Sequence, residues 1–415
     1  MDRGMLRRWS LGAVLSLGTL LAGLFSLGGC GGGYSTPTTG PVLTATSTSL
    51  IDAPTLKGWM DKGLVNATSG EKVVVLEVNP QANYDAGHIP GALIMDSSKE
   101  LTKTRLEGVA YISSMILDGT SLDAIVKRSG IDANTTVVFS VNKAGSWMNM
   151  TRAYFTFRYW GFPKERLKIL NGGDDAWVDA GNSLMTDTPT VRVSTYSIRN
   201  NKSLNAGLYC SIGQMINLVD TINLGSQNIG INGISILDER GGAPTTYVAN
   251  AQVDDFNQYG TLITGKTTKI NDANAIQARL NLMGVTQSKA MSYVYCASGM
   301  RASVAFFAID GVMQWPVSLY DGSWNQWSAY RAANLPDVSG QPSPWRIDVN
   351  TPVTILPRTT GTALTGTLIL FGTPANSVTD PSANQIQLDN LNYYNTGTTS
   401  SNVSNAPGSS TPGGC

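Results

Sequence analysis

Short apolar runs recur along the middle of the chain, and segments with helical spacing separate them. Four runs have the length and β-branched content of buried strands: Lys72–Val78, Thr136–Ser140, Leu167–Leu170 and Met291–Tyr295. Between the second and third runs, Thr151–Trp160 has helical spacing and is followed by a Gly-Phe-Pro stop signal. Strands that alternate with helices are typical of a parallel sheet covered by helices. The pattern therefore predicts an α/β fold.

Start and stop signals predict two further helices. Asp52 precedes a proline and apolar residues at helical spacing, which predicts a helix from Asp52 to Met60. Asn171-Gly172-Gly173 follows the third apolar run and leads into Asp174–Ala180. The acidic first turn and the glycine after the last residue predict a short helix there.

The chain beyond Trp345 follows a different pattern. Val353–Pro357, Ala363–Phe371 and Gln385–Tyr394 carry alternating apolar residues, which predicts a small C-terminal appendage of short strands. From Thr396 onward the composition is mainly Gly, Ser, Thr, Asn and Pro, so we expect a disordered tail. Cys415 in this tail is either a resolving thiol or a cysteine without function.

The N-terminal segment indicates a compartment. A basic head of three arginines precedes the apolar stretch Leu11–Leu27, and Leu27-Gly28-Gly29-Cys30 closes it. This segment resembles a bacterial lipoprotein signal with its lipobox, cleaved before Cys30; the alternative is an uncleaved transmembrane anchor. The resemblance implies that Cys30 carries lipid and anchors the protein to a membrane. Gly31 in place of aspartate implies the outer membrane by resemblance to enterobacterial sorting, so we expect a lipid-anchored protein of the cell envelope.

Charge and composition argue against two classes of function. The chain has 29 Lys and Arg against 29 Asp and Glu, whereas nucleic-acid binding calls for a basic surface. The single histidine is His88, and the four cysteines (Cys30, Cys210, Cys296 and Cys415) have no ligand-like spacing. A Cys/His metal site is therefore not expected. A Cys–His or Ser–His–Asp catalytic arrangement is disfavoured for the same reason.

Cys296 is the main candidate for chemistry. It ends an apolar run, and the small-residue loop Ala297-Ser298-Gly299-Met300-Arg301 separates it from the helical pattern Ala302–Phe307. Backbone N–H groups and the start of a helix converge in such a loop, which favours a thiolate over a thiol. Gly299 gives the backbone the freedom this cradle needs, and Arg301 adds a positive charge. We therefore expect Cys296 to be a nucleophile.

Two other interpretations of Cys296 stay open. One is a disulfide between Cys210 and Cys296. The other is a sensor of oxidants, in which Cys296 reversibly forms sulfenic acid or a disulfide with Cys210 or Cys415.

Two segments of the first half carry a resemblance to a known family. Tyr84-Asp85-Ala86-Gly87-His88-Ile89-Pro90-Gly91-Ala92 and Leu170-Asn171-Gly172-Gly173-Asp174-Asp175-Ala176-Trp177 resemble the two signature segments of a rhodanese homology domain. No cysteine lies between them, so this half resembles the inactive N-terminal half of tandem thiosulfate and mercaptopyruvate sulfurtransferases.

The second half resembles the active half of that family. Ser235–Arg240 is similar to its first strand with an acidic-x-Arg end, Cys296–Arg301 to its Cys-x-x-Gly loop, and Leu319–Trp327 to its closing segment. The Gly-His-Ile-Pro-Gly-Ala segment has no good counterpart here, since Gly265-Lys266-Thr267 matches it poorly. We expect Thr245–Asn271 to be remodelled.

The resemblance implies a division of the chain. It gives a signal peptide (1–29), a flexible tether (30–48), a non-catalytic rhodanese-like domain (49–190), a catalytic rhodanese-like domain (191–348), a C-terminal extension with short strands (349–395) and a disordered tail (396–415). Each domain is expected to be a mostly parallel sheet flanked by helices.

The resemblance also implies an activity. Cys296 would accept a sulfane sulfur from an anionic donor (thiosulfate, 3-mercaptopyruvate, a polysulfide or a persulfide) and pass it from a persulfide to a thiol or cyanide. Arg240 and Ala297, Ser298, Gly299, Met300 and Arg301 would bind the substrate, without any metal or organic cofactor. Neutral Ala297 and Ser298 resemble the mercaptopyruvate type. The alternative is a non-enzymatic, lipid-anchored module that binds an envelope redox assembly.

The other conspicuous residues have structural interpretations. His88 is expected to be hydrogen-bonded within a turn, and Asp238 to accept hydrogen bonds at a strand end. Arg301 either contacts substrate or pairs with the first domain. The tryptophans are expected to be core anchors: Trp147, Trp160, Trp177, Trp324 and Trp327.

Overall fold

The computed structural model describes residues 49–107, 110–223, 233–242, 244, 246–248, 251–333 and 384–399, which all fall within one compact unit, Gly40–Cys415. The predicted signal, the tether, the segments Val353–Pro357 and Ala363–Phe371, and the tail from residue 400 lie outside these residues. No helix in the described ranges combines the length and apolar character needed to cross a membrane.

A five-stranded parallel sheet forms the first half. Its order is β1-β7-β6-β2-β3, and every neighbouring pair is parallel. The predicted strands in this half are confirmed. Their continuous apolar runs fit a parallel sheet, in which both faces of a strand are buried. The strands are β1 (Leu50–Ile51), β2 (Lys72–Glu77), β3 (Leu93–Ile94), β6 (Thr135–Ser140) and β7 (Leu167–Leu170).

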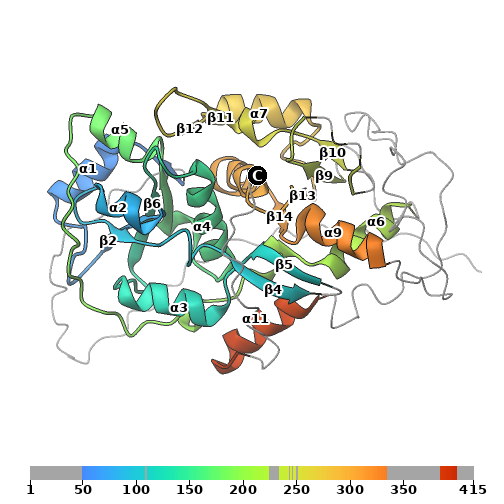
Figure 1. The fold of residues 1–415 in the computed structure, drawn as a ribbon, viewed down its shortest axis with the longest axis horizontal. Helices are drawn as coiled ribbons and strands as arrows, with labels where there is room; N and C mark the ends of the chain where they lie inside the picture. Colours follow the sequence, from blue (N-terminus) through green and yellow to red (C-terminus); the bar gives the residue numbers. More distant parts are fainter. Residues whose placement is uncertain are drawn as a thin grey trace, which may run out of the picture. The chain divides into compact units, whose positions relative to one another are not determined.

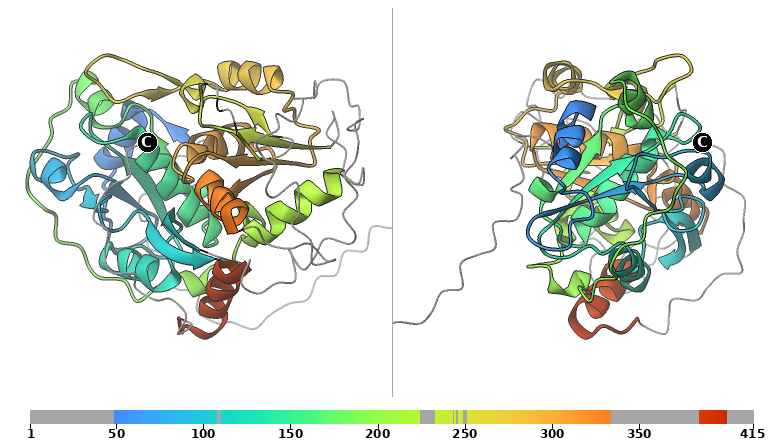
Figure 2. Two further views of the ribbon diagram at one scale, coloured as in Figure 1. Left: turned by 45° about the vertical axis from the view of Figure 1, so that its right-hand side comes forward. Right: turned by 90° about the vertical axis from the view of Figure 1, so that its left-hand side faces the viewer.

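Helices flank this sheet (Figures 1 and 2). The predicted first helix is present, and the Asp52 side chain caps it by accepting a hydrogen bond from the Thr55 N–H. The central helix α4 begins at Trp147, four residues before the predicted start. The helices are α1 (Ala53–Asp61), α2 (Gln81–Asp85), α3 (Gly119–Arg128), α4 (Trp147–Tyr159) and α5 (Gly173–Asp179).

A second five-stranded parallel sheet follows in the order β10-β9-β13-β14-β8. Its strands are β8 (Tyr209–Cys210), β9 (Ile234–Asp238), β10 (Gln252–Val253), β13 (Met291–Tyr295) and β14 (Val317–Tyr320). Its helices are α6 (Ile212–Asn223), α7 (Ala273–Leu282), α8 (Ala302–Phe307) and α9 (Ser323–Ala333), and α8 continues into a π-helical segment, Ala308–Met313. The two sheets show the predicted α/β architecture; the domain boundaries themselves stay a prediction.

Two antiparallel pairs were not expected from the sequence. One pairs β4 (Lys103–Glu107) with β5 (Ala110–Met115), and the other pairs β11 (Gly260–Thr261) with β12 (Lys269–Ile270). The second lies within the segment that we expected to be remodelled. It contacts the first half, because the Asn171 side chain bonds to the backbone of Ile270 and Lys266 pairs with Asp179.

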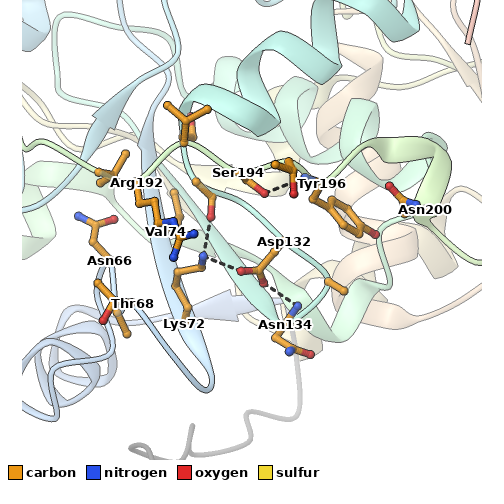
Figure 3. A pocket seen from close by; sticks show the side chains of 17 residues that line it. Asn66, Thr68, Lys72, Val74, Asp132, Asn134, Arg192, Ser194, Tyr196 and Asn200 are labelled. Atoms are coloured by element: carbon orange, nitrogen blue, oxygen red, sulfur yellow. Dashed lines mark hydrogen bonds and ion pairs between the residues drawn. The ribbon is translucent and has the colours of Figure 1, made fainter.

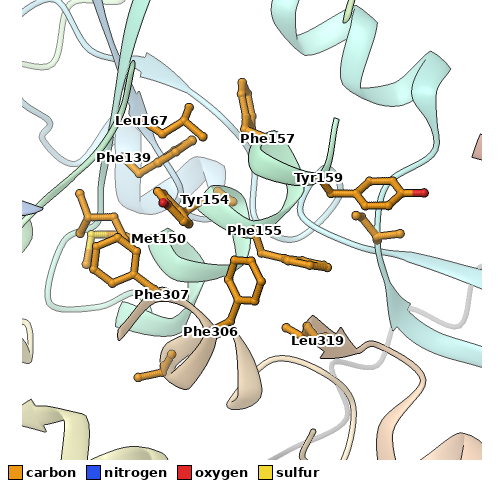
Figure 4. Packing of buried hydrophobic residues seen from close by; sticks show 14 of the residues in the cluster. Phe139, Met150, Tyr154, Phe155, Phe157, Tyr159, Leu167, Phe306, Phe307 and Leu319 are labelled. Carbon is orange, nitrogen blue, oxygen red and sulfur yellow. The ribbon is translucent and has the colours of Figure 1, made fainter. Parts of the chain in front are cut away.

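The two halves share one hydrophobic core. Helix α4 is buried along nearly its whole length, and its aromatic side chains meet those of α8 (Figure 4). The rings of Tyr154 and Phe307 pack edge to face with centroids 4.8 Å apart, and those of Phe155 and Phe306 at 4.9 Å. This packing holds α8, the helix that follows the Cys296 loop, against α4.

The expected strand at Gln385–Tyr394 is wrong. The segment is a helix, α11 (Gln385–Thr396), next to β4 and α3 (Figure 1). Its buried side chains have helical spacing and include two polar ones: Ile386, Asp389, Asn390 and Tyr393. Asn390 accepts a hydrogen bond of 2.9 Å from Arg105, and the Tyr393 hydroxyl donates to Asp123 at 2.7 Å. The tail prediction also began too early, since this helix runs through Thr396.

Candidate active site

The Cys296 loop connects β13 to α8 and is held by the segment that follows β14. The backbone N–H of Cys296 donates to the Ser323 hydroxyl at 3.2 Å. In return, the N–H of Trp324 donates to the Cys296 carbonyl at 3.0 Å, and that of Asn325 to the Ala297 carbonyl at 3.0 Å. The segment expected to close the site therefore fixes the backbone at Cys296.

Backbone amides converge on the Cys296 sulfur as predicted. The Ser298 N–H donates to Sγ at 3.4 Å, and the amides of Gly299, Arg301 and Ala302 also stabilise negative charge on it. Gly299 has φ +80°, a left-handed conformation that a residue with a side chain rarely adopts. The loop is therefore an amide cradle for an anionic sulfur.

The prediction that the loop favours a thiolate is wrong for this resting structure. Cys296 is fully buried. Burial raises the pKa of the thiol, and although the four amides lower it, the net pKa lies above the ordinary value. Desolvation outweighs the amides here because no water reaches the charged form. The thiol is therefore protonated at neutral pH until its surroundings change.

Arg240 and Arg301 meet beside this loop. The Arg240 side chain pairs with Asp238 at 2.6 Å and lies over the Trp324 ring, 4.6 Å from its centroid. Its carbonyl accepts a hydrogen bond of 2.9 Å from the Arg301 guanidinium, which also lies 5.7 Å from the centroid of the Phe256 ring. The expected ion pair between Arg301 and the first half is not found among the described residues. Asp238 also accepts a hydrogen bond from Tyr295, as expected for a strand end.

The two arginines line a pocket of about 340 Å³. Met148 from α4 and Phe256 provide apolar surface, and Asp255 is its one acidic lining residue. Cys296 is not among the lining residues, and Met300 packs partly buried against the core. The structure thus brings the predicted arginines together next to the loop, while Cys296 itself is buried and does not line the pocket.

A buried ion pair lies against the Cys296 loop. Arg152 of α4 pairs with Asp321, which directly follows β14, and both side chains are fully buried. Arg152 also donates to the Ser114 carbonyl at 2.8 Å, and Asp321 accepts from the Ile116 N–H at 2.7 Å. A Cβ atom on Gly299 would lie 2.8 Å from the Asp321 carboxylate and 3.0 Å from the Arg152 guanidinium. The loop therefore sits directly against this pair.

Glu239 is a site residue to which the sequence analysis gave no role. It follows β9 directly, is fully buried, and neither of its carboxyl oxygens has a hydrogen-bond partner among the residues that the structure describes. Burial raises its pKa well above the ordinary value, and the charges of Asp254, Asp238 and Cys296 raise it further. The available signal was an acidic residue at the middle position of Asp238-Glu239-Arg240, where the strand pattern requires a buried side chain.

The first half has an equivalent loop without a thiol. Val141 follows β6 as Cys296 follows β13, and its carbonyl accepts from the Asp174 N–H at 3.1 Å. His88 is structural, as predicted: it is buried, its ring stacks on Tyr84, and its two nitrogens lie 2.9 and 3.1 Å from the Tyr84 and Asp187 carbonyls. Because the loop that begins at Val141 has no cysteine, it cannot carry a persulfide.

The remaining cysteines and tryptophans answer two open questions. Cys210 and Cys296 are both free and buried, so the suggested disulfide between them is wrong. Trp160, Trp177 and Trp327 are core residues, while Trp324 is partly buried beneath Arg240. In the described ranges, no group of three or more His, Cys, Asp or Glu side chains could hold a metal ion.

A larger pocket, of about 710 Å³, lies near the start of β2 in the first sheet (Figure 3). It is lined near the start of β2 by Lys72, whose ammonium group bonds to Asp132 at 2.7 Å. Its lining holds neither a cysteine nor a histidine. Because ligands of parallel α/β sheets bind at the carboxyl ends of the strands, the loop at Cys296 is the better candidate for the active site.

Comparison with known proteins finds a rhodanese-like domain and related sulfurtransferases. Residues 60–180 match the family model of the rhodanese-like domain. The chain is 28% identical over 286 residues to SseB of Mycobacterium tuberculosis, named as a candidate thiosulfate sulfurtransferase (64% of this chain, 91% of SseB). It is 27% identical over 278 residues to the sulfur carrier protein TtuD of Thermus thermophilus (62% and 88%). It is 26% identical over 260 residues to a thiosulfate sulfurtransferase of Corynebacterium glutamicum (59% and 78%).

Solved structures show the same fold. The structure superimposes on YnjE with a TM-score of 0.51 at 20% identity, covering 68% of this chain and 66% of YnjE. A variant of EanB in complex with ergothioneine gives a TM-score of 0.51 at 20% identity, with 68% of each chain covered. Residues 60–180 thus match a rhodanese-like domain, and the similarity to named sulfurtransferases supports a rhodanese-like protein of sulfur transfer.

Proposed function

We propose that this protein is a sulfurtransferase that carries a sulfane sulfur as a persulfide on Cys296. The observation that carries the proposal is the cradle of four amides around a cysteine at the carboxyl end of a central strand. Such a cradle stabilises negative charge on sulfur in the same way that an oxyanion hole stabilises it on oxygen. The relatives named thiosulfate sulfurtransferase and sulfur carrier protein support the same chemistry.

The reaction is a double displacement. The Cys296 thiolate attacks the outer sulfur of the donor, a new S–S bond forms, and the rest of the donor leaves with the electron pair of the broken bond. With thiosulfate the leaving group is sulfite. The terminal sulfur of the persulfide keeps a negative charge, and a thiol or cyanide then takes this sulfur and releases the thiolate.

The pocket beside the loop supports an anionic donor. Arg240 and Arg301 contribute two guanidinium groups, which bind carboxylate, sulfonate or thiosulfonate oxygens. Met148 and Phe256 provide apolar surface for a small carbon skeleton such as that of 3-mercaptopyruvate. Entry of the donor requires the surroundings of Cys296 to open, since the sulfur is buried at rest.

Turnover with a sulfur donor and cyanide tests the proposal. Thiocyanate formation is measured for the native chain and for Cys296→Ser, with thiosulfate and 3-mercaptopyruvate in turn. We expect the variant to lose activity, and mass spectrometry of the donor-treated native protein to show one added sulfur on the peptide that contains Cys296. Cys210→Ser is the matched control. Cys210 is also free and buried, but it does not begin an amide-lined loop as Cys296 does. Equal rates for the native chain and Cys296→Ser contradict the proposal.

The runner-up function is a non-enzymatic module that binds an envelope redox assembly. The unexpected α11 and the β11–β12 pair, which a simple tandem enzyme does not require, favour it. Equal turnover in the experiment above would support it.

Anchoring is a separate proposal. We propose that Cys30 carries lipid and holds the protein in the cell envelope, in the outer membrane; its support is the sequence pattern around Cys30. Labelling of the native chain, but not of Cys30→Ser, with a fatty acid in bacterial cells tests it.

A further inference from the structure

Glu239 and Cys296 leave neighbouring strands at the same level. Strands β9 and β13 pair in parallel with Asp238 opposite Tyr295, and the Glu239 N–H donates to the Tyr295 carbonyl at 2.8 Å. Glu239 and Cys296 are the next residues of the two chains. Adjacent strands lie about 4.8 Å apart. The two residues therefore stand side by side at the carboxyl edge of the sheet.

Their side chains point to the same face. Side chains alternate along a strand, and Asp238 and Tyr295 share one face because the Tyr295 hydroxyl donates to the Asp238 carboxylate at 2.9 Å. Glu239 and Cys296 therefore project from the other face. The preceding residues of that face, Leu237 and Val294, lie in the same core cluster as Cys296. The Glu239 carboxyl group is thus directed to the side of the sheet that holds the sulfur.

The surroundings of Glu239 keep it neutral. Asp254 and Asp238 are buried acids near it, and their partners are the arginines Arg279 and Arg240 and the hydroxyls of Tyr259 and Tyr295. Within the described part of the chain, no such partner satisfies Glu239, since both its carboxyl oxygens are without a hydrogen bond there. An unpaired buried carboxylate is costly, and burial, Asp254, Asp238 and an ionised Cys296 all raise its pKa. Its O–H group is therefore free to donate.

We propose that Glu239 is a carboxylic acid that donates a hydrogen bond to the negative charge on the Cys296 sulfur, in the thiolate and in the persulfide. The inference rests on the proposed function for the persulfide and on the geometry alone for the thiolate. In the resting structure neither oxygen is bonded, and contacts of this kind are often long until charge develops. The side chain supplies what the amide cradle lacks, a donor on the sheet side of the sulfur.

The proton balance is simple. Once the site opens for the donor, the Cys296 thiol proton passes to the water that enters with it, before attack, and the Glu239 proton stays on its carboxyl group throughout. When Sγ attacks the outer sulfur of thiosulfate, the Sγ–S bond forms, the S–S bond of the donor breaks, and sulfite leaves with the bonding pair. One negative charge remains on the terminal sulfur, and Glu239 stabilises it without adding a second charge.

Two substitutions test whether Glu239 acts as a hydrogen-bond donor, as an ionised carboxylate or only as a core residue. Glu239→Gln keeps the shape and a neutral N–H donor, whereas Glu239→Leu fills the space without one. The readout is the ultraviolet absorbance of the Cys296 thiolate during a pH titration, taken for each variant as the difference from the same variant with Cys296→Ser. This measurement needs no sulfur donor, so it stays informative even if the proposed turnover is not found. Circular dichroism checks that each variant is folded.

We expect Glu239→Gln to titrate like the native chain. We expect Glu239→Leu to titrate at higher pH, with about tenfold less thiolate at a given pH, which is the size expected from one lost hydrogen bond to a charged atom. An unchanged titration in Glu239→Leu overturns the proposal, because Glu239 would then be a core residue only. A titration at lower pH in Glu239→Gln also overturns it, because Glu239 would then be an ionised group that opposes the thiolate.

Discussion

The chemistry of Cys296 depends on two opposed effects at a single residue. Four backbone amides favour the charged sulfur, and complete burial disfavours it. The result is a thiol that is protected at rest; in the proposed function it becomes a nucleophile when a donor enters the site. An added sulfur extends the charge away from the buried Sγ, so the same amides gain influence in the persulfide.

Gly299 is the residue on which the shape of the cradle depends. Its φ of +80° and the nearby Arg152–Asp321 pair leave no room for a side chain. We expect Gly299→Ala to lower the free energy of unfolding by about 2–4 kcal/mol, from the left-handed backbone and the displaced ion pair together. Urea denaturation measures this change.

Gly181 offers a matched control for that substitution. It has φ +84°, and a Cβ atom there would meet nothing within 4 Å. Gly181→Ala should therefore cost only the backbone share, about 1–2 kcal/mol. Equal losses in the two variants would mean that contact with the ion pair contributes nothing.

At the scale of elements, the sequence predicted what continuous apolar runs and turn signals specify. Four strands coincide with continuous apolar runs, which are typical of a buried parallel sheet: β2, β6, β7 and β13. The Cys296 loop was predicted from the end of the last run. Helix α11 was missed because its buried face contains Asp389 and Asn390, which become core residues only through Arg105 of β4. The strand pattern of Asp238-Glu239-Arg240 marks Glu239 as buried, but only the tertiary structure shows which groups surround its carboxyl group.

The docking of α11 depends on a glycine in another helix. Gly119 opens α3, and a Cβ atom there would overlap the Tyr393 ring. We expect Gly119→Ala to push α11 away from α3, with a loss of about 1–3 kcal/mol from overpacking. Limited proteolysis should then cleave the chain within residues 384–399 at a higher rate.

Gly58→Ala is the control for the effect of replacing a helical glycine with alanine. Gly58 lies inside α1, and a Cβ atom there would meet nothing within 4 Å. That variant should gain up to about 1 kcal/mol from the better helix former and leave proteolysis of α11 unchanged. If Gly119→Ala behaves in the same way, Tyr393 does not hold α11 in place.

On the scale of the whole molecule, buried polar groups connect the two sheets and α11. Arg152 joins α4 to Asp321 after β14, and Arg158 of α4 joins Asp310 of the π-helical segment at 2.9 Å. These pairs cost desolvation free energy, and breaking one by removing a single partner costs about 3–5 kcal/mol. They therefore fix the position of α4 against the Cys296 loop more than they add to net stability.

Glu107 is the buried acid at which several of these elements meet. It ends β4 and accepts hydrogen bonds from Gln326 of α9 at 2.9 Å, from the Ile386 N–H of α11 at 3.3 Å, and from the Tyr209 hydroxyl of β8 at 3.3 Å. Burial raises its pKa to about 7, although the hydrogen bonds from Gln326 and Ile386 and the charge of Arg105 lower it. The carboxyl group therefore changes charge near neutral pH.

This pKa makes the stability of the protein depend on pH. The unfolded chain loses the Glu107 proton near the ordinary pKa of about 4.5, whereas the folded chain keeps it to about 7. Between these values the folded state binds more protons, so the free energy of unfolding falls as pH rises, by about 3 kcal/mol from this group. Below the lower value both states are protonated, and the group has no effect.

Glu107→Gln removes this titration and keeps the size of the side chain. Chemical denaturation of both proteins at several pH values gives the difference in their unfolding free energies, in which the other titrating groups cancel. We expect this difference to shift by about 3 kcal/mol in favour of the variant between pH 4.5 and 7, and to be flat outside that window. A constant difference across the window would show that Glu107 is already ionised at low pH, and that Gln326, Ile386 and Tyr209 outweigh its burial.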